Sequence, residues 1–309
     1  MNNSRLFSLI TLGVALSMPA LAVTKQNTAK PVTKKLCEHF APANDRQIPV
    51  GSINERTKGA SGITKAQFND AIKKITTVYA PIVKAQGATL IFNNKWTDAT
   101  VNSDAYQEGS NWYVDAYGGL ARYNTMTEDG MVFVFCHEMG HHLGGFPKFG
   151  GDDWASVEGQ ADYFAAMKCF RRVYQNDDNI SIVAKTTIPK EVANGCSNEF
   201  TDPKDIALCE RSSEVGLVLA DVLWDLGKDG GGEPANSPSF STPSKDKVTT
   251  TEEDHPMAQC RLDTYFNGAI CPVTYTEDFG VSDAQTGACS QEHKDKIGYR
   301  PVCWYAPSK

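Results

Sequence analysis

A helical spacing of apolar side chains begins near Thr64. Thr64 and Gln67 have the spacing of a capping box, in which the side chain of each residue bonds the backbone N–H of the other. Apolar side chains then recur at steps of three or four residues until Gly87 ends the stretch. Pro81 lies within this stretch and predicts a bend. We therefore expect one amphipathic helix over residues 64–87.

Two short apolar runs follow this helix and predict strands. Residues 88–92 and residues 111–117 are rich in β-branched and aromatic side chains, and Gly118 and Gly119 end the second run. We expect the strand at 111–117 to form an edge of the sheet, on which a substrate could add as an extended strand.

Three longer stretches predict helices, over residues 127–143, 154 to about 174, and about 204 to 226. The first has Thr125 and Glu128 as its capping box and Gly144 and Gly145 as its stop. It also contains the unbroken apolar run MVFVF at residues 131–135, which predicts a helix that is buried on all sides. The pattern as a whole predicts an α+β fold that is mainly helical with a small sheet.

The first 22 residues have the pattern of a secretory signal peptide. One cation, Arg5, precedes an apolar stretch over residues 6–18, and residues 20–22 form a small-x-small cleavage site. The alternative is an N-terminal membrane anchor, but the apolar stretch is short for a spanning helix and polar residues follow the cleavage site. We expect residues 1–22 to be removed and the protein to be exported, to the periplasm or outside the cell.

The remaining chain is expected to form one domain, residues 61–309, behind an extended polar lead-in of residues 23–60. Residues 228–251 are rich in Gly, Pro, Ser and Lys and predict a flexible surface loop, because too little chain follows to build a second domain. Residues 260–309 form a cysteine-rich tail that we expect to be braced by disulfides. No further apolar run of about eighteen residues follows the signal peptide, so no transmembrane segment is expected after cleavage.

Charge and cysteine content narrow the class of protein. The chain has 37 acidic and 30 basic residues, a formal net charge of −7, and no basic block that would neutralise phosphates, so the sequence does not favour nucleic-acid binding. It has nine cysteines, all of them after residue 22, which in an exported chain are expected to be mostly disulfides. An odd number leaves at least one thiol unpaired or paired between chains.

The sequence alone does not fix the disulfide pairing. Pairing between neighbours suggests Cys196 with Cys209, Cys260 with Cys271, and Cys289 with Cys303. Cys136 is then either the leftover thiol or the partner of Cys169.

The apolar run of residues 131–135 leads directly into side chains that can bind a metal ion. His137 and His141 are four positions apart, so on a helix they lie on one face about 6 Å apart, where one zinc ion can bridge them. Glu138 leans towards the same ion and can take a proton from the water that the ion activates. Gly140 costs about 1 kcal/mol of helix propensity, which makes sense where another backbone or a ligand comes close. The alternative is a pair of helix histidines that bind no metal.

Two carboxylates on the next predicted helix strengthen the metal interpretation. Glu158 and Asp162 are four positions apart within an otherwise apolar stretch, so two buried carboxylates would repel each other unless a cation met them. A zinc site supplies that cation, with Glu158 as the third ligand and Asp162 as the acceptor for the N–H of a ligand imidazole. The alternative is an acidic face that points to solvent.

Three motifs in this order resemble the gluzincin metallopeptidases of the HtpX heat-shock protease and CAAX prenyl protease type. The first is HEMGH, and the second is the pattern S-x-E-x-x-A-D, whose glutamate, Glu158, lies 17 residues after the second histidine of HEMGH. The third is His255-Pro256 followed by Arg261, similar to the family's H-P-x-x-x-x-R segment near the metal. Unlike the membrane-embedded relatives, this chain has no spanning helix after its signal, and its cysteine-rich tail has no counterpart in them.

The resemblance implies a zincin-like metallopeptidase domain with one Zn²⁺ per chain. It implies His137, His141 and Glu158 as ligands and Glu138 as the base. It also makes His255 or Arg261 the group that binds the oxyanion, and we name Tyr113, Tyr117 and Tyr123 as the next candidates for that role. We expect His142, which points about 100° away from His141, to be a structural or rim histidine, and His39 to be a surface group.

The sequence therefore predicts an exported zinc endopeptidase that hydrolyses a peptide or protein substrate. Two alternatives stay open. One is a zinc-stabilised binding or chaperone-like protein of the cell envelope with weak or no catalysis, against which the intact Glu138 argues. The other is a zinc hydrolase that acts on substrates other than peptides. The oligomeric state and the physiological substrate are not indicated by the sequence.

Overall fold

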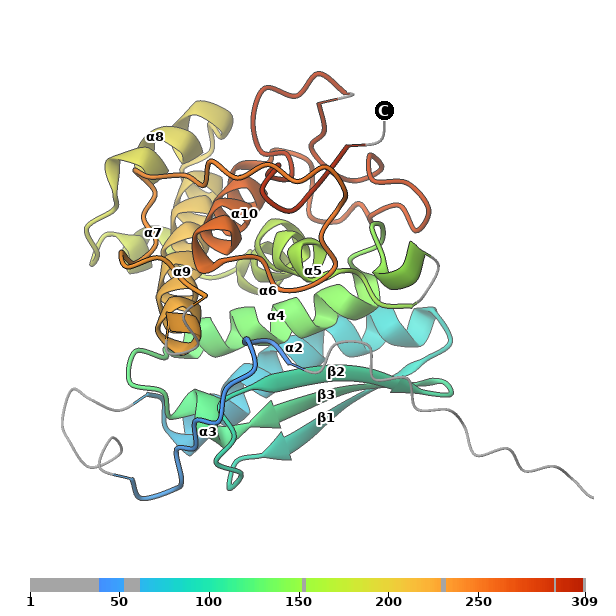
Figure 1. The fold of residues 1–309 in the computed structure, drawn as a ribbon, viewed down its shortest axis with the longest axis vertical. Helices are drawn as coiled ribbons and strands as arrows, with labels where there is room; N and C mark the ends of the chain where they lie inside the picture. The colour runs from blue at the N-terminus through green and yellow to red at the C-terminus, as the bar shows by residue number, and fades with distance from the viewer. Residues whose placement is uncertain (1–38, 53–61, 152–153, 229–231, 292, 308–309) are drawn as a thin grey trace, which may run out of the picture. The chain divides into compact units, whose positions relative to one another are not determined.

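The computed structural model describes residues 39–52, 62–151, 154–228, 232–291 and 293–307. These residues belong to one compact unit of helices with a small three-stranded sheet, which confirms the α+β class (Figure 1). The predicted signal peptide lies outside the described residues, as does most of the predicted lead-in. None of the helices in the described part of the chain has the length and apolar composition that a membrane crossing requires.

The sheet has the strand order β1–β3–β2, with bounds Thr89–Lys95 for β1, Ser103–Glu108 for β2 and Asn111–Tyr117 for β3. β3 is parallel to β1 and antiparallel to β2. The prediction that residues 111–117 form an edge is therefore wrong, because β3 is paired on both sides. The edges are β1 and β2. The sequence did not indicate β2, because its residues SDAYQE are mostly polar.

Two long helices lie against the sheet, α2 (Lys65–Ala85) and α4 (Glu128–Leu143), joined to it through β1 and the short helix α3 (Gly118–Ala121). The capping box of α2 forms as predicted, with Thr64 accepting from the backbone of Gln67. The predicted cap of α4 is wrong by two residues. Thr127, not Thr125, accepts a hydrogen bond from the backbone of Gly130 at 2.9 Å.

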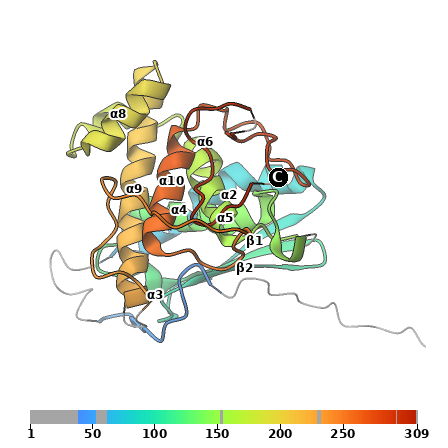
Figure 2. The same ribbon diagram turned by 45° about the horizontal axis from the view of Figure 1, so that its top comes forward.

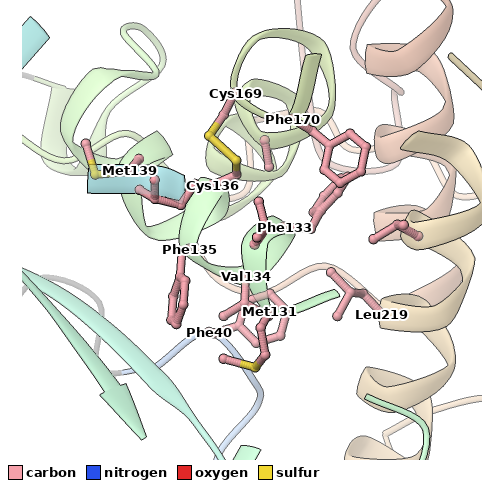
Figure 3. Packing of buried hydrophobic residues seen from close by; sticks show 14 of the residues in the cluster. Phe40, Met131, Phe133, Val134, Phe135, Cys136, Met139, Cys169, Phe170 and Leu219 are labelled. Carbon is pink, nitrogen blue, oxygen red and sulfur yellow. A yellow bond between two sulfur atoms is a disulfide. The ribbon is translucent and has the colours of Figure 1, made fainter. Parts of the chain in front are cut away.

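α4 is the central layer of the fold, because it contacts the sheet and α2 on one side and the later helices on the other (Figure 1). All five side chains of the MVFVF run are fully buried. Phe135 packs edge-on against Phe68 of α2 and Phe92 of β1. On the other side of α4, Phe133 packs against Tyr265 and against Phe170, which lies beside it in Figure 3. Burial on both sides holds the second half of α4, which carries the two histidines, inside the protein.

The helix predicted to begin at residue 154 begins at Glu158, and it is made of three parts: α5 (Glu158–Phe164), the π-helical turn η2 (Ala165–Phe170) and α6 (Arg171–Tyr174). Before it, the short turn η1 (Phe149–Gly151) and a bridge between Lys148 and Ser156 replace the predicted first turn.

The helix predicted at residues 204–226 is α9 (Pro203–Gly227). In the described part of the chain, the sequence pattern did not predict α3 or the later helices α7 (Asn179–Val183), α8 (Lys190–Glu199) and α10 (Ala258–Ile270). α9 and α10 lie side by side (Figure 2). Of the loop predicted at residues 228–251, Lys228 caps α9, and residues 232–251 contain no helix or strand.

Four disulfides brace the described chain: Cys136–Cys169, Cys196–Cys209, Cys260–Cys303 and Cys271–Cys289. The first two pairs were suggested by the sequence, but the pairings of Cys260 with Cys271 and of Cys289 with Cys303 are wrong. Cys260 lies inside α10 and Cys271 directly follows it, so eleven residues of helix separate them by about 16 Å, too far for a disulfide. Cys37 lies outside the described residues.

Candidate metal centre

Three predicted ligands meet in the interior between α4 and α5. The Nε2 atoms of His137 and His141 are 3.1 Å apart. The carboxylate of Glu158, the first residue of α5, places one oxygen 3.2 Å from Nε2 of His137 and the other 3.5 Å from Nε2 of His141. One potential ligand atom from each residue lies within 4.8 Å of the others, and all three side chains are buried. This cluster could hold a metal ion.

Hydrogen bonds on the far side of each imidazole fix how the two histidines face the cluster. Nδ1 of His137 lies 2.7 Å from Oδ1 of Asp162, and Nδ1 of His141 lies 2.8 Å from the carbonyl oxygen of Ser156. Both partners are acceptors, so each Nδ1 carries its proton. In the neutral rings, both Nε2 lone pairs then point into the cluster. Two lone pairs and a carboxylate that face one another suit a cation.

Close packing of α4 on α5 explains the glycine within the HEMGH sequence. A Cβ atom added to Gly140 would lie 2.7 Å from the Cα atom of Ala161 and 2.7 Å from its carbonyl oxygen. The two helix backbones therefore touch between the histidine pair and Asp162. The sequence-based expectation that another backbone comes close at Gly140 is confirmed.

We expect Gly140→Ala to destabilise the fold by about 1–3 kcal/mol, the usual cost of overpacking, although alanine is the better helix former. The added methyl group would force α4 and α5 apart, so Glu158 would move away from the histidines and the metal content should fall. Thermal unfolding and metal analysis of the purified variant measure the two effects.

Gly130→Ala is the matched control on the same helix. Its added Cβ would meet the flexible Sδ atom of Met126 at 2.9 Å rather than a backbone. We expect it to keep the parent metal content and to change stability little. Equal behaviour of the two variants would show that the helix contact does not require glycine at position 140.

The buried charges around the cluster are paired in a chain that starts at Arg261. Arg261 makes two bonds to the carboxylate of Asp162, at 2.7 and 2.8 Å, and Asp162 also accepts a hydrogen bond from Tyr265 at 3.1 Å. Burial opposes the charge of Asp162, but Arg261 and His137 hold the pKa of this carboxyl below its usual value. The arginine thus keeps Asp162 ionised behind the ligand His137.

The remaining carboxylate of the cluster, Glu158, also stays charged. Burial opposes its charge, but the neighbouring His255, His141 and His137 lower its pKa well below the usual value. Burial likewise opposes a charge on His137, yet Asp162 and Glu158 raise its pKa to about 9. The two carboxylates thus favour a positive charge at His137.

Glu138 lies beside the ligands and faces β2. Burial raises its pKa to about 8, with His137 lowering it and Asp104 of β2 raising it, while a hydrogen bond from the side chain of Ser103 favours the charged form. Its Oε1 atom is buried without a hydrogen-bond partner among the described residues.

His255 and Arg261, the two predicted oxyanion donors, lie at different distances from the ligand carboxylate and differ in burial. Nε2 of His255 lies 3.3 Å from Oε2 of Glu158, and the side chain of this histidine is 22% exposed. Arg261 is 1% exposed and lies behind His137, where its bonds go to Asp162 and to the carbonyl oxygen of Phe40. Of the two, only the histidine is adjacent to the ligand carboxylate.

The C-terminal tail holds the start of α5 in place. Trp304 is fully buried, and a Cβ added to Gly159 would lie 2.2 Å from its ring. Arg300 donates to the side chain of Gln160, and Tyr163 donates to the carbonyl oxygen of Gly298. The cysteine-rich tail thus fixes the helix that carries Glu158.

Other candidates lie outside the ligand cluster. His142 is stacked between the rings of Trp112 and Trp154, as expected of a structural histidine. The three alternative oxyanion donors make other contacts: Tyr113 stacks on Tyr106, Tyr117 donates to Asp104, and Tyr123 contacts Asp225.

Sequence reasoning missed the residues that close the site, namely His39, Phe40, Asn102 and Ser103. His39 was interpreted as a surface group. Its imidazole is 38% exposed, yet its carbonyl oxygen reaches His255 at 2.6 Å. No periodic pattern surrounds these residues, so the sequence contains no signal that could have found them.

No protein-family model, curated protein or solved structure matches the chain. The likeness to the gluzincin peptidases thus depends on the three sequence motifs, and the family assignment stays a prediction.

Proposed function

We propose that the protein is an exported, zinc-dependent endopeptidase. The observation that carries the proposal is the convergence of two imidazole Nε2 atoms and one carboxylate, with a second carboxylate, Glu138, beside them. Catalytic zinc sites typically have three protein ligands, here two nitrogens and one oxygen, and a fourth coordination position for water or substrate. A zinc ion bound there would lower the pKa of water and would polarise the carbonyl group of a substrate.

The residues of the site have separate roles as base, as ligands and as a positioning residue. Glu138 is the base, because its carboxylate is next to the ligands, where it can take a proton from water and return it. His137 and His141 are held as ligands by Asp162 and Ser156. Arg261 keeps Asp162 charged and so acts as a positioning residue.

His255 is the group that donates a hydrogen bond to the substrate oxygen. It is adjacent to the ligand carboxylate, whereas the guanidinium of Arg261 is engaged by Asp162 and Phe40. Four disulfides in the described chain support export to an oxidising compartment.

Metal content and proteolysis test the proposal together. We expect one zinc ion per purified chain, and we expect hydrolysis of an unfolded protein that stops with a chelator and returns with added zinc. A chain that binds no metal ion, or hydrolysis that a chelator leaves unchanged, would contradict the proposal.

We expect His255→Ala to lower kcat by about 10²-fold or more while KM changes little, because the contact forms mainly in the transition state. The zinc content should stay at the parent value. His293→Ala, at an exposed histidine outside the cluster, is the control and should keep the parent kcat. A parent-like kcat in the His255 variant would mean that the donor is a different group.

A further inference from the structure

The metal centre is closed to solvent by the chain's own residues. His137, Glu138, His141 and Glu158 are each at most 1% exposed, although an endopeptidase must admit a peptide to these groups. The residues over them are His39 to Ala41, which run along β2 and are part of the blue segment in Figure 1. We call residues 39–41 the closing segment.

Main-chain N–H groups bond the closing segment to the first residue of β2 and to Asn102, the residue before it. The N–H of Phe40 donates to the carbonyl oxygen of Ser103 at 2.9 Å. The N–H of Ala41 donates to the side chain of Asn102 at 2.8 Å, and the same amide group reaches back to the carbonyl oxygen of Ala41 at 3.4 Å.

The carbonyl oxygens of the segment contact the side chains of His255 and Arg261, both from the third motif. Nε2 of His255 lies 2.6 Å from the carbonyl oxygen of His39, and Arg261 donates to the carbonyl oxygen of Phe40 at 2.8 Å. The peptide bond between His39 and Phe40 is therefore held at both ends. His255, beside Glu158, holds its oxygen, and Ser103, which also contacts Glu138, holds its nitrogen.

The two side chains on either side of this bond differ in their exposure to solvent. The Phe40 ring is fully buried, edge-on to the ring of His137 at 5.1 Å and under the guanidinium of Arg261 at 4.9 Å. The His39 side chain is 38% exposed and pairs with Asp104 at 2.9 Å. The site thus has an enclosed apolar pocket for the residue after the bond and a partly open position for the residue before it.

We propose that the closing segment occupies the cleft as a bound peptide substrate would, and that His39–Phe40 is the first peptide bond that the site hydrolyses. The inference rests on the proposed function. The oxygen of a water molecule bonds to the carbonyl carbon of His39, and the bond from this carbon to the nitrogen of Phe40 breaks. Glu138 takes a proton from the water and passes it to that nitrogen, which leaves as an amine.

The same contacts indicate the substrate class. A substrate in trans would need a large apolar or aromatic side chain directly after the bond that is cut, because the Phe40 ring fills a pocket formed by His137 and Arg261. Its residue before the bond can be polar, because that side chain stays partly exposed.

Self-cleavage is tested on the full chain, prepared free of metal and then given one equivalent of zinc. Intact mass and N-terminal sequencing should show a new chain that begins at Phe40. The rate should not change with protein concentration, because the bond and the site belong to one molecule. Glu138→Gln should prevent the cut. An intact bond between His39 and Phe40, or a rate proportional to concentration, overturns the proposal.

Hydrolysis of an unfolded protein by the same preparation separates this inference from the proposed function. Hydrolysis in trans with an intact His39–Phe40 bond overturns the inference alone. A preparation that binds zinc but cuts neither the unfolded protein nor itself overturns both.

Hydrogen exchange of the metal-free chain gives a readout that needs no catalysis. The amide hydrogens of Phe40 and Ala41 should exchange slowly, because they are bonded to Ser103 and Asn102. Exchange at the rate of an unstructured peptide would show that the segment does not occupy the cleft, and the proposal would fail.

Substitutions at Phe40 test the pocket. Phe40→Leu, which keeps an apolar side chain, should still be cut before residue 40, whereas Phe40→Gly should be cut at least tenfold more slowly. His39→Ala should still give a chain that begins at Phe40. Thermal unfolding shows whether each variant is folded, and equal rates for the leucine and glycine variants in folded protein would refute the pocket.

Discussion

Glu138→Gln is expected to lower the turnover of a peptide substrate by about 10²- to 10⁴-fold, the range that a general base usually contributes. Glutamine has the size and the helix propensity of glutamate, but its carboxamide cannot accept a proton at neutral pH. Because Glu138 is not among the three clustered ligand residues, the zinc content should stay at the parent value. Steady-state kinetics and metal analysis of the same preparation measure the two quantities.

Glu128→Gln is a matched control for this experiment. Glu128 lies in the first turn of the same helix, partly exposed, and pairs with Lys74 on α2. Such a pair contributes at most about 1 kcal/mol to stability, so the control should keep both its zinc and its activity. Parent-like turnover in Glu138→Gln would remove Glu138 from the mechanism, even if the metal site were correct.

The local features of the site could be predicted because they depend on helical periodicity. His137 and His141 share a face because they are four residues apart on α4, and the apolar run before them is buried as expected. The same spacing on α5 brings Glu158 and Asp162 to one side, and Asp162 reaches Nδ1 of His137. Spacing within one helix is a property of the sequence alone.

Features that depend on contacts between distant residues could not be predicted in the same way. The central position of β3 depends on pairing with β2, whose polar residues give no strand signal. The pairing of Cys260 with Cys303 depends on the return of the tail to α10. Nearness along the chain is therefore a poor guide to disulfide partners across a helix of this length.

The contact of residues 39–41 with the metal centre is another feature that depends on residues far apart in the sequence. Phe40 contacts His137 and Arg261, which are about 100 and about 220 residues further along the chain. Its neighbours in the sequence show no helical or strand period, so the stretch looks like a lead-in to the domain. The tertiary contacts change that interpretation, because they make His39–Ala41 part of the wall of the metal centre.

Glu158→Gln is expected to lower the affinity for zinc by at least about 10²-fold. Loss of a residue that only supports a ligand already costs about 10- to 100-fold, and Glu158 lies in direct reach of both histidine Nε2 atoms. The neutral amide also removes the negative charge that a dication requires in a buried site. His137 and His141, on one helix, would remain as a weaker two-ligand site.

Metal titration monitored by thermal unfolding measures the change. Zinc should raise the unfolding temperature of the parent chain, because an ion that binds only the folded state stabilises it by mass action. The same zinc concentration should have little effect on Glu158→Gln. Glu253→Gln is the control, because Glu253 is exposed and is not among the clustered ligand residues, although its carbonyl oxygen accepts from the N–H of Glu158. Stoichiometric zinc retained by Glu158→Gln, with an undiminished rise in unfolding temperature, would show that the ion does not depend on the α5 carboxylate.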